Sequence, residues 1–298
     1  MTSDRDGALF PDPNLERAIR KAIGKRKERI TPADLVGLTE LRAPGRGITN
    51  LEGLQYCTGL RRLNLGSEPF IDSRLLRIEI RARIRSYLRS LRSERNSKKL
   101  HDLSGLDPGF IQPYGIRDLL RLYLRPRKPE GTCNEIHDLT PLAGLAKLRV
   151  LELGSNQIGD LSPLAELNQL TCLDLCSNEI TDVTPLAGLT HLTWLIVSGN
   201  QINDLTPLAG LTQLTSLRLD GNRLTDLTPL AGLNQLTDLW LSSNEITDLT
   251  PLAGLNQLTD LWMIGNPITD LTPLAGLTQL KSLGIDGNGL TDLTPLAG

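Results

Sequence analysis

The sequence predicts an α/β fold, a right-handed solenoid with a parallel β-sheet on its concave side and short 3-10 or helical turns on its convex side. Three observations lead to this prediction. A unit of 22 residues recurs, each unit contains the alternating pattern Leu-x-Leu, and most units continue into Thr-Pro-Leu-Ala-Gly. Units of this length bury their leucines only by stacking on one another. The period is clearest at the asparagines: Asn134, Asn156, Asn178, Asn200, Asn222, Asn244, Asn266 and Asn288.

The composition of one unit explains the predicted layers. Alternation of leucine with variable residues predicts a short strand with one buried face. The asparagine after the strand, if buried, can satisfy backbone groups of neighbouring turns. In Thr-Pro-Leu-Ala-Gly, threonine is expected as the N-cap, proline at the first helical position and glycine beyond the end of one helical turn. The aspartate two residues before the threonine adds an acceptor near the start of that turn.

Residues 1–37 are expected to form a helical N-terminal cap, and residues 38–298 the solenoid. Leu15, Ile19 and Ile23 share one face of a predicted helix, and a Thr-Pro pair begins a second one. Two degenerate units follow. Such a cap would shield the first turn of the solenoid from water.

An irregular insertion is predicted at about residues 68–132. On paper it keeps the phase of the repeat, since 134 − 68 = 66, which is three periods of 22. Asp72 and Leu76 align with the aspartate and the leucine of a regular convex segment. A strand of the solenoid is expected to resume at Leu122 and Leu124.

Residues 76–91 within this insertion fit two conformations. Apolar residues alternate with charged ones, as in a strand, and they also recur at helical spacing. We favour a long helix, because a strand would leave an exposed edge. The alternating set is Leu76, Ile78, Ile80, Ala82 and Ile84, and the helical set is Leu76, Ile80, Ile84, Leu88 and Leu91.

The insertion is basic and the later repeats are acidic. Residues 74–128 contain 15 Lys and Arg against 5 Asp and Glu, a difference of +10, and residues 135–298 contain 5 against 18, a difference of −13. The basic excess is typical either of a surface for nucleic acid or another polyanion, or of a solvated face. Self-association with the acidic repeats is a further alternative. The candidate polyanion-binding residues are Arg77, Arg81, Arg83, Arg85, Arg89, Arg92 and Arg95.

The repeated unit LxxLxLxxNxITDLTPLAGL resembles that of leucine-rich-repeat proteins of the 22-residue class, which bacterial internalins share with a eukaryotic phosphatase-regulating subunit. The match covers about residues 38–298 apart from the insertion. The resemblance implies a capped solenoid that serves as the recognition arm of a larger signalling or surface protein.

Strand alternation places the residues beside the leucines on the concave face. Trp240 and Trp262 are 22 residues apart, so we expect them side by side on strands about 4.8 Å apart. An aromatic patch with a charged rim is typical of protein interfaces. The leading prediction is non-catalytic recognition of a protein or peptide, of basic character because aspartates accompany the tryptophans. Alternatively, the tryptophan pair stiffens the sheet. The candidate partner-binding residues are Glu152, Asp174, Trp194, Ile196, Arg218, Asp220, Asp238, Trp240, Asp260, Trp262 and Ile264.

The sequence predicts no enzyme, no cofactor and no metal site. It lacks a phosphate-binding glycine loop, an H-E-x-x-H motif and a G-x-S-x-G motif. His101 and His137 each replace a threonine of the repeat. The four cysteines show no metal-ligand spacing, and Cys172 and Cys176, at a strand rise, are about 13 Å apart, too far for a disulfide. Free thiols in a reducing compartment are therefore expected.

The ends of the chain suggest a location and a context. No run of about 18 apolar residues occurs, and the N-terminus lacks the apolar core of a secretory signal. A cytoplasmic protein is expected, or a cell-surface one if the chain is a processed or truncated form. The last unit stops at Gly298 with its leucines uncovered, which predicts either a longer protein or end-to-end self-association.

Overall fold

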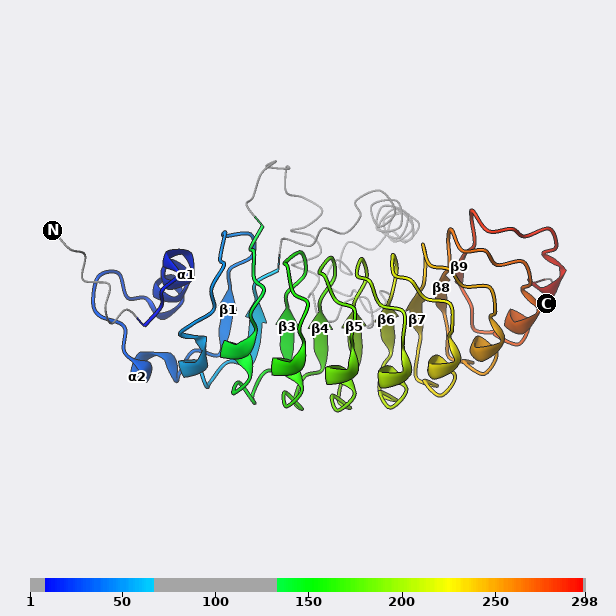
Figure 1. Ribbon diagram of the computed structural model, residues 1–298. Helices are drawn as coiled ribbons and strands as arrows, with labels where there is room; N and C mark the ends of the chain where they lie inside the picture. Colours follow the sequence, from blue (N-terminus) through cyan, green and yellow to red (C-terminus); the bar gives the residue numbers. More distant parts are fainter. Residues whose placement is uncertain (1–8, 67–132, 297–298) are drawn as a thin grey trace, which may run out of the picture. The chain divides into compact units, whose positions relative to one another are not determined.

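The computed structural model describes residues 9–66 and 133–296, which belong to one compact unit. Their centre is a nine-stranded sheet in which strand order follows chain order (Figure 1). All neighbours are parallel, and from β3 onward each residue pairs with the residue 22 positions later, as Leu151 does with Leu173. The strands are β1 (Glu40–Arg42), β2 (Arg62–Asn64), β3 (Val150–Glu152), β4 (Cys172–Asp174), β5 (Trp194–Ile196), β6 (Ser216–Arg218), β7 (Asp238–Trp240), β8 (Asp260–Trp262) and β9 (Ser282–Gly284).

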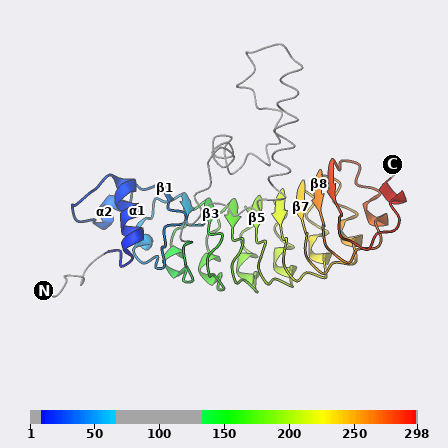
Figure 2. The same cartoon turned by 90° about the horizontal axis from the view of Figure 1, so that it is seen from above.

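Short 3-10 turns form the opposite, convex side of each 22-residue turn of the solenoid, here called a coil (Figure 2). We expected threonine to be the N-cap, and this is wrong: threonine is the first residue of the turn. The aspartate side chain instead accepts a hydrogen bond from the threonine backbone N–H, as between Thr206 and Asp204 at 2.8 Å. The turns are η1 (Leu54–Tyr56), η2 (Thr140–Leu142), η3 (Ser162–Leu164), η4 (Thr184–Leu186), η5 (Thr206–Leu208), η6 (Thr228–Leu230), η7 (Thr250–Leu252), η8 (Thr272–Leu274) and η9 (Thr294–Leu296).

Two helices precede the first strand, as predicted. They are α1 (Pro13–Ile23) and α2 (Pro32–Leu35). Asp12 caps α1 by accepting from two backbone N–H groups of its first turn, and its other carboxylate oxygen accepts from the backbone N–H of Thr49. One aspartate thus fixes the helix both to its own start and to the chain that follows β1. Leu15 and Ile19 of α1 are fully buried.

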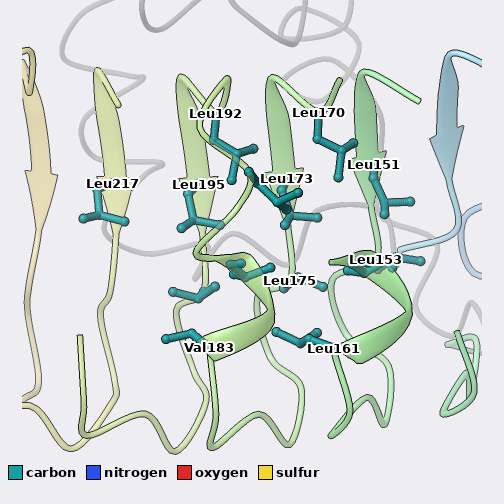
Figure 3. Packing of buried hydrophobic residues seen from close by; sticks show 14 of the residues in the cluster. Leu151, Leu153, Leu161, Leu170, Leu173, Leu175, Val183, Leu192, Leu195 and Leu217 are labelled. Atoms are coloured by element: carbon teal, nitrogen blue, oxygen red, sulfur yellow. The ribbon is translucent and has the colours of Figure 1, made fainter. Parts of the chain in front are cut away.

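Leucines fill the space between the sheet and the convex turns. Figure 3 shows Leu151, Leu173, Leu195 and Leu217 on successive strands, and all four are fully buried. Burial of a leucine side chain contributes about 1.5–3 kcal/mol, and here every coil repeats the same contacts. The sequence pattern therefore predicted this core correctly.

The recurring asparagines form a ladder inside the coils. Asn178 accepts a hydrogen bond from the backbone N–H of Ile158, and its amide donates to the carbonyl oxygens of Leu175 and Leu153. Asn200, Asn222, Asn244 and Asn266 repeat this arrangement. Each asparagine thus satisfies backbone groups in two adjacent coils, as predicted, because an unpaired buried backbone group is unfavourable.

Asn134 makes the same bonds as these asparagines, but with residues far earlier in the chain. It accepts from the N–H of Ile48 and donates to the carbonyl oxygens of Leu65 and Ala43. Residues 133–148 therefore complete the coil that β2 begins. In that coil Cys133 takes the position that follows Gly66, although 66 residues lie between them in the sequence.

This arrangement corrects two expectations about the basic insertion. β2 pairs directly with β3, Leu63 with Leu151, so no strand at Leu122 and Leu124 lies between them. Asp138 and Leu142 occupy the convex positions expected for Asp72 and Leu76. The agreement of 66 with three periods therefore does not reflect three coils. The choice between helix and strand for residues 76–91 lies outside the described residues.

Candidate recognition surface on the concave sheet face

The concave sheet face is formed by the first and third residues of each strand and by the residue two positions after the strand. These side chains lie opposite the core leucines. Parallel pairing aligns Arg218, Trp240, Trp262 and Gly284 at one position on β6, β7, β8 and β9. The four residues thus form a row that crosses the strands.

The three side chains of this row stack on one another. The Arg218 guanidinium carbon lies 4.3 Å from the centroid of the Trp240 ring, a cation–π geometry. The centroids of Trp240 and Trp262 are 5.5 Å apart and the rings are tilted by 34°. Aromatic pairs at such separations contribute about 0.5–1.5 kcal/mol beyond the area that they bury. The two tryptophans therefore lie side by side, as their spacing of 22 residues predicted.

Gly284 completes the row by leaving room for an indole. A Cβ atom at this position would lie 2.3 Å from Cε3 of Trp262. The ring of Trp262 therefore leans over the backbone of β9, a position that any other residue at 284 would obstruct. Gly284 was not among the predicted site residues. The available signal was a glycine aligned 22 residues after Trp262, where the repeat places larger side chains.

Trp194 and Ile196 of β5 also belong to this face, although each is only 8% exposed. Ile196 pairs with Arg218, whereas Trp194 aligns with Ser216. Trp194 therefore lies outside the Arg218–Trp240–Trp262 row. Adjacent strands hold such side chains about 4.8 Å apart, so neighbours cover part of one another.

Acidic residues accompany the row on both sides. Asp238 and Asp260 align with each other on β7 and β8, and each accepts a hydrogen bond from the hydroxyl of the preceding threonine at 2.8 Å. Asp220 accepts from the Ser198 hydroxyl and from the backbone N–H of Ser242. Burial raises the pKa of Asp220, against the opposing effects of Arg218 and of these hydrogen bonds.

The remaining predicted residues lie further along the same face. Glu152 of β3 accepts a hydrogen bond from the Asn64 amide of β2. Asp174 of β4 accepts from the backbone N–H of Cys176 and is buried. Ile264 follows β8 and is half-buried. The structure thus brings Arg218, Trp240 and Trp262 into contact. Asp220, Asp238, Asp260 and Ile264 lie on the same or adjacent coils.

The candidate polyanion-binding arginines lie outside the described residues, and their role stays a prediction. These are Arg77, Arg81, Arg83, Arg85, Arg89, Arg92 and Arg95. The same holds for His101, whereas His137 directly precedes Asp138, whose carboxylate accepts a hydrogen bond from the backbone N–H of Thr140, the first residue of η2.

The cysteines of the described coils are free thiols. Burial raises the pKa of the Cys57 thiol to about 12 and also raises the pKa of Cys172 and Cys176. A buried neutral thiol is a poor nucleophile, because the thiolate is the reactive form.

Within residues 9–66 and 133–296, no group of three or more His, Cys, Asp or Glu side chains is placed to hold a metal ion. In the same ranges, no helix has the length and apolar character that crossing a bilayer requires.

Known proteins share both the repeat and the fold. Residues 146–188, 168–210, 190–232, 212–254 and 234–276 match the family model for leucine rich repeats (2 copies). Internalin H of Listeria monocytogenes serovar 1/2a is 48% identical over 59 residues, which are 19% of this chain and 11% of the length of that relative.

Solved internalin structures cover far more of the chain. The crystal structure of internalin C2 from Listeria monocytogenes strain 4b F2365 is 34% identical, spans 95% of each chain and superimposes with a TM-score of 0.68. An internalin (inlF) from the same strain is 28% identical over 97% of this chain and 79% of that one, with a TM-score of 0.59. The repeat, the sheet of stacked coils and this full-length similarity lead to one conclusion. The chain belongs to the leucine-rich-repeat proteins of the internalin family.

Proposed function

We propose that the protein is a non-catalytic recognition module that binds a protein or peptide through its concave sheet face. The observation that carries the proposal is the stack of Arg218, Trp240 and Trp262 on that face. Tryptophan and arginine are the residue types most enriched among the energetic centres of protein interfaces. All three tryptophans of the chain lie on this one face.

This proposal and a purely structural role for the tryptophans predict different effects when the stack is removed. Leu239 lies between Asp238 and Trp240 on β7 and is fully buried on the opposite side of the sheet. The core leucines therefore hold the coil together independently of the stack. If the stack served stability alone, its removal would lower the free energy of unfolding and leave partner binding unchanged.

The test is the double variant Trp240→Ala with Trp262→Ala. We expect the free energy of unfolding to fall by about 1–2 kcal/mol, the sum of an aromatic pair and a partial loss of packing, and partner capture in pull-downs from the native cell to be lost. Tyr56→Ala removes an aromatic residue that lies on η1, away from the sheet, and should leave capture intact.

Leu239→Ala provides the opposite control. Deletion of a buried leucine side chain costs about 2–5 kcal/mol, so this variant should be less stable than the tryptophan double variant. A double variant that destabilises the protein as strongly as Leu239→Ala, yet still captures the partner, would refute the proposal.

A further inference from the structure

Three N–H donors on the concave sheet face have no acceptor among the described residues. They are Nε of Arg218, Nε1 of Trp240 and Nε1 of Trp262, and all three atoms are buried. They belong to adjacent strands at one register position. A buried donor without an acceptor is unfavourable, and native proteins contain few of them. Three in one row therefore point to a ligand that supplies oxygen atoms.

The surroundings determine which kind of oxygen is suitable. Asp220, Asp238 and Asp260 lie next to the row, and Arg218 is its one basic side chain. A carboxylate or phosphate ligand would meet several like charges at short range, which is unfavourable. Neutral carbonyl oxygens avoid this repulsion, and an extended main chain presents such oxygens repeatedly.

We infer that the row binds an extended, basic peptide segment of a partner protein, whose main-chain carbonyl oxygens accept from Arg218 Nε, Trp240 Nε1 and Trp262 Nε1. Lysine or arginine side chains of the segment lie against the indole faces and the neighbouring aspartates. The inference rests on the proposed function and adds the chemistry of the partner to it.

Access to the donors follows from the partial exposure of the rings. Trp240 and Trp262 are both half-buried, so a segment meets the indole faces first. In the bound state we expect the indoles to have turned about their side-chain bonds, so that the N–H groups, which are buried in the free protein, face the carbonyl oxygens. Because the three tryptophans of the chain all belong to this face, intrinsic fluorescence reports on the concave sheet face.

The test titrates the full chain with a capped octapeptide of alternating lysine and threonine, followed by tryptophan fluorescence and by anisotropy of the labelled peptide. Two further probes separate the contribution of the positive side-chain charge from that of the main-chain carbonyl oxygens. The same peptide with glutamate in place of lysine tests the sign of the charge. Spermine supplies positive charge without carbonyl oxygens. We expect the lysine peptide to bind and to shift the emission, and we expect the glutamate peptide and spermine to bind at least tenfold more weakly.

Variants then assign the atoms. Trp240→Phe with Trp262→Phe keeps both aromatic rings and removes both N–H groups, and we expect it to weaken the lysine peptide about tenfold, as the loss of two hydrogen bonds implies. Tyr56→Phe is the matched control and should change affinity less than twofold. Asp238→Asn with Asp260→Asn should weaken binding at low salt. Glu179→Gln with Glu245→Gln, which removes the same charge from exposed positions after the ladder asparagines, should not.

Three results would overturn the inference: equal affinity for spermine, unchanged affinity of the phenylalanine variant, or preference for the glutamate peptide. The proposed function has a separate outcome. If Trp240→Ala with Trp262→Ala abolishes capture of the natural partner while the lysine peptide fails to bind, the concave face recognises a partner of different chemistry.

Discussion

The Trp262 indole lies where it does because residue 284 has no side chain. The row Arg218–Trp240–Trp262 ends over the backbone of β9, and the missing Cβ of Gly284 provides the space. This is a requirement of packing and not of backbone conformation. Gly284 thus provides the space that the Trp262 ring occupies at the end of the stack.

Gly284→Ala tests this point. The new methyl group would lie 2.3 Å from the ring, so we expect the indole to move, the emission of the protein to shift and partner binding to weaken. Overpacking costs about 1–3 kcal/mol in a core, and we expect the lower part of that range because the ring is half-buried. Gly232→Ala, which meets no atom within 4 Å, is the matched control and should change neither property. Unchanged fluorescence in Gly284→Ala would contradict the assigned role.

At the scale of the element, each convex turn depends on an aspartate. Asp182, Asp204, Asp226, Asp248 and Asp270 accept hydrogen bonds from the side chain and the backbone N–H of the threonine two residues later, and these bonds lower the pKa of each carboxyl group. A lowered pKa in the folded state means that the folded state favours the carboxylate. The associated stability is present above the ordinary carboxyl pKa of 3.8 and is lost as the pH falls through the lower, folded-state value.

Acid should therefore weaken the solenoid through these turns. We expect the melting temperature to fall as the pH is lowered from 5 to about 2, measured by circular dichroism. The triple variant Asp204→Asn, Asp226→Asn and Asp248→Asn retains an acceptor oxygen in each turn and removes the titration, so its melting temperature should depend less on pH in this range. An identical pH dependence of the variant and the parent would show that the turns do not cause the effect.

The repeat made most elements predictable, and its limits are also physical. Strand alternation correctly assigned Leu151 and Leu239 to the core, because a period of two leaves no alternative when one face is buried. The position of the threonine in the convex turn was wrong, because both threonine and the preceding aspartate can serve as acceptors and the sequence does not show which one does. The contact between Arg218 and Trp240 and the space at Gly284 depend on side-chain orientation, which the repeat does not determine.

For the molecule as a whole, the closure of the coil around residues 67–132 is the feature that the sequence alone could not show. Alignment by period suggested that this segment keeps the phase of the repeat and contributes a strand at Leu122 and Leu124. The hydrogen bonds of Asn134 with Ile48 and Leu65 instead assign residues 133–148 to the coil of β2. Long-range contacts of this kind are set by the fold and leave no local signature.

Deletion of residues 67–132 should therefore leave a folded solenoid. Joining Gly66 to Cys133 creates the segment Leu-Gly-Cys-Asn, which matches Leu-Gly-Ser-Asn at residues 153–156. We expect the deletion variant to unfold cooperatively, with a melting temperature close to that of the full chain. Its circular dichroism spectrum should show that the strands and turns of the solenoid are retained. Loss of cooperative unfolding would contradict the assignment of residues 133–148 to the coil of β2.

The same deletion separates the two candidate functions. Partner capture by the concave sheet face should survive it, whereas any binding of polyanions that depends on the arginines between Arg77 and Arg95 should disappear. Polyanion binding should be measured for the full chain and for the deletion variant at several salt concentrations. Release of counterions makes such binding strongly sensitive to ionic strength.

The two-residue turn before each ladder asparagine has a consequence for how such a chain can change its length. In the later coils its second residue has positive φ and is either serine or glycine: Ser155, Ser177, Gly199, Gly221, Ser243, Gly265 and Gly287. In the coil of β2, 66 residues enter at this point and the next strand still pairs in register. A segment of this length can therefore be inserted at such a turn without changing the pairing of the neighbouring strands, and we expect the equivalent turns of the later coils to accept grafted segments in the same way.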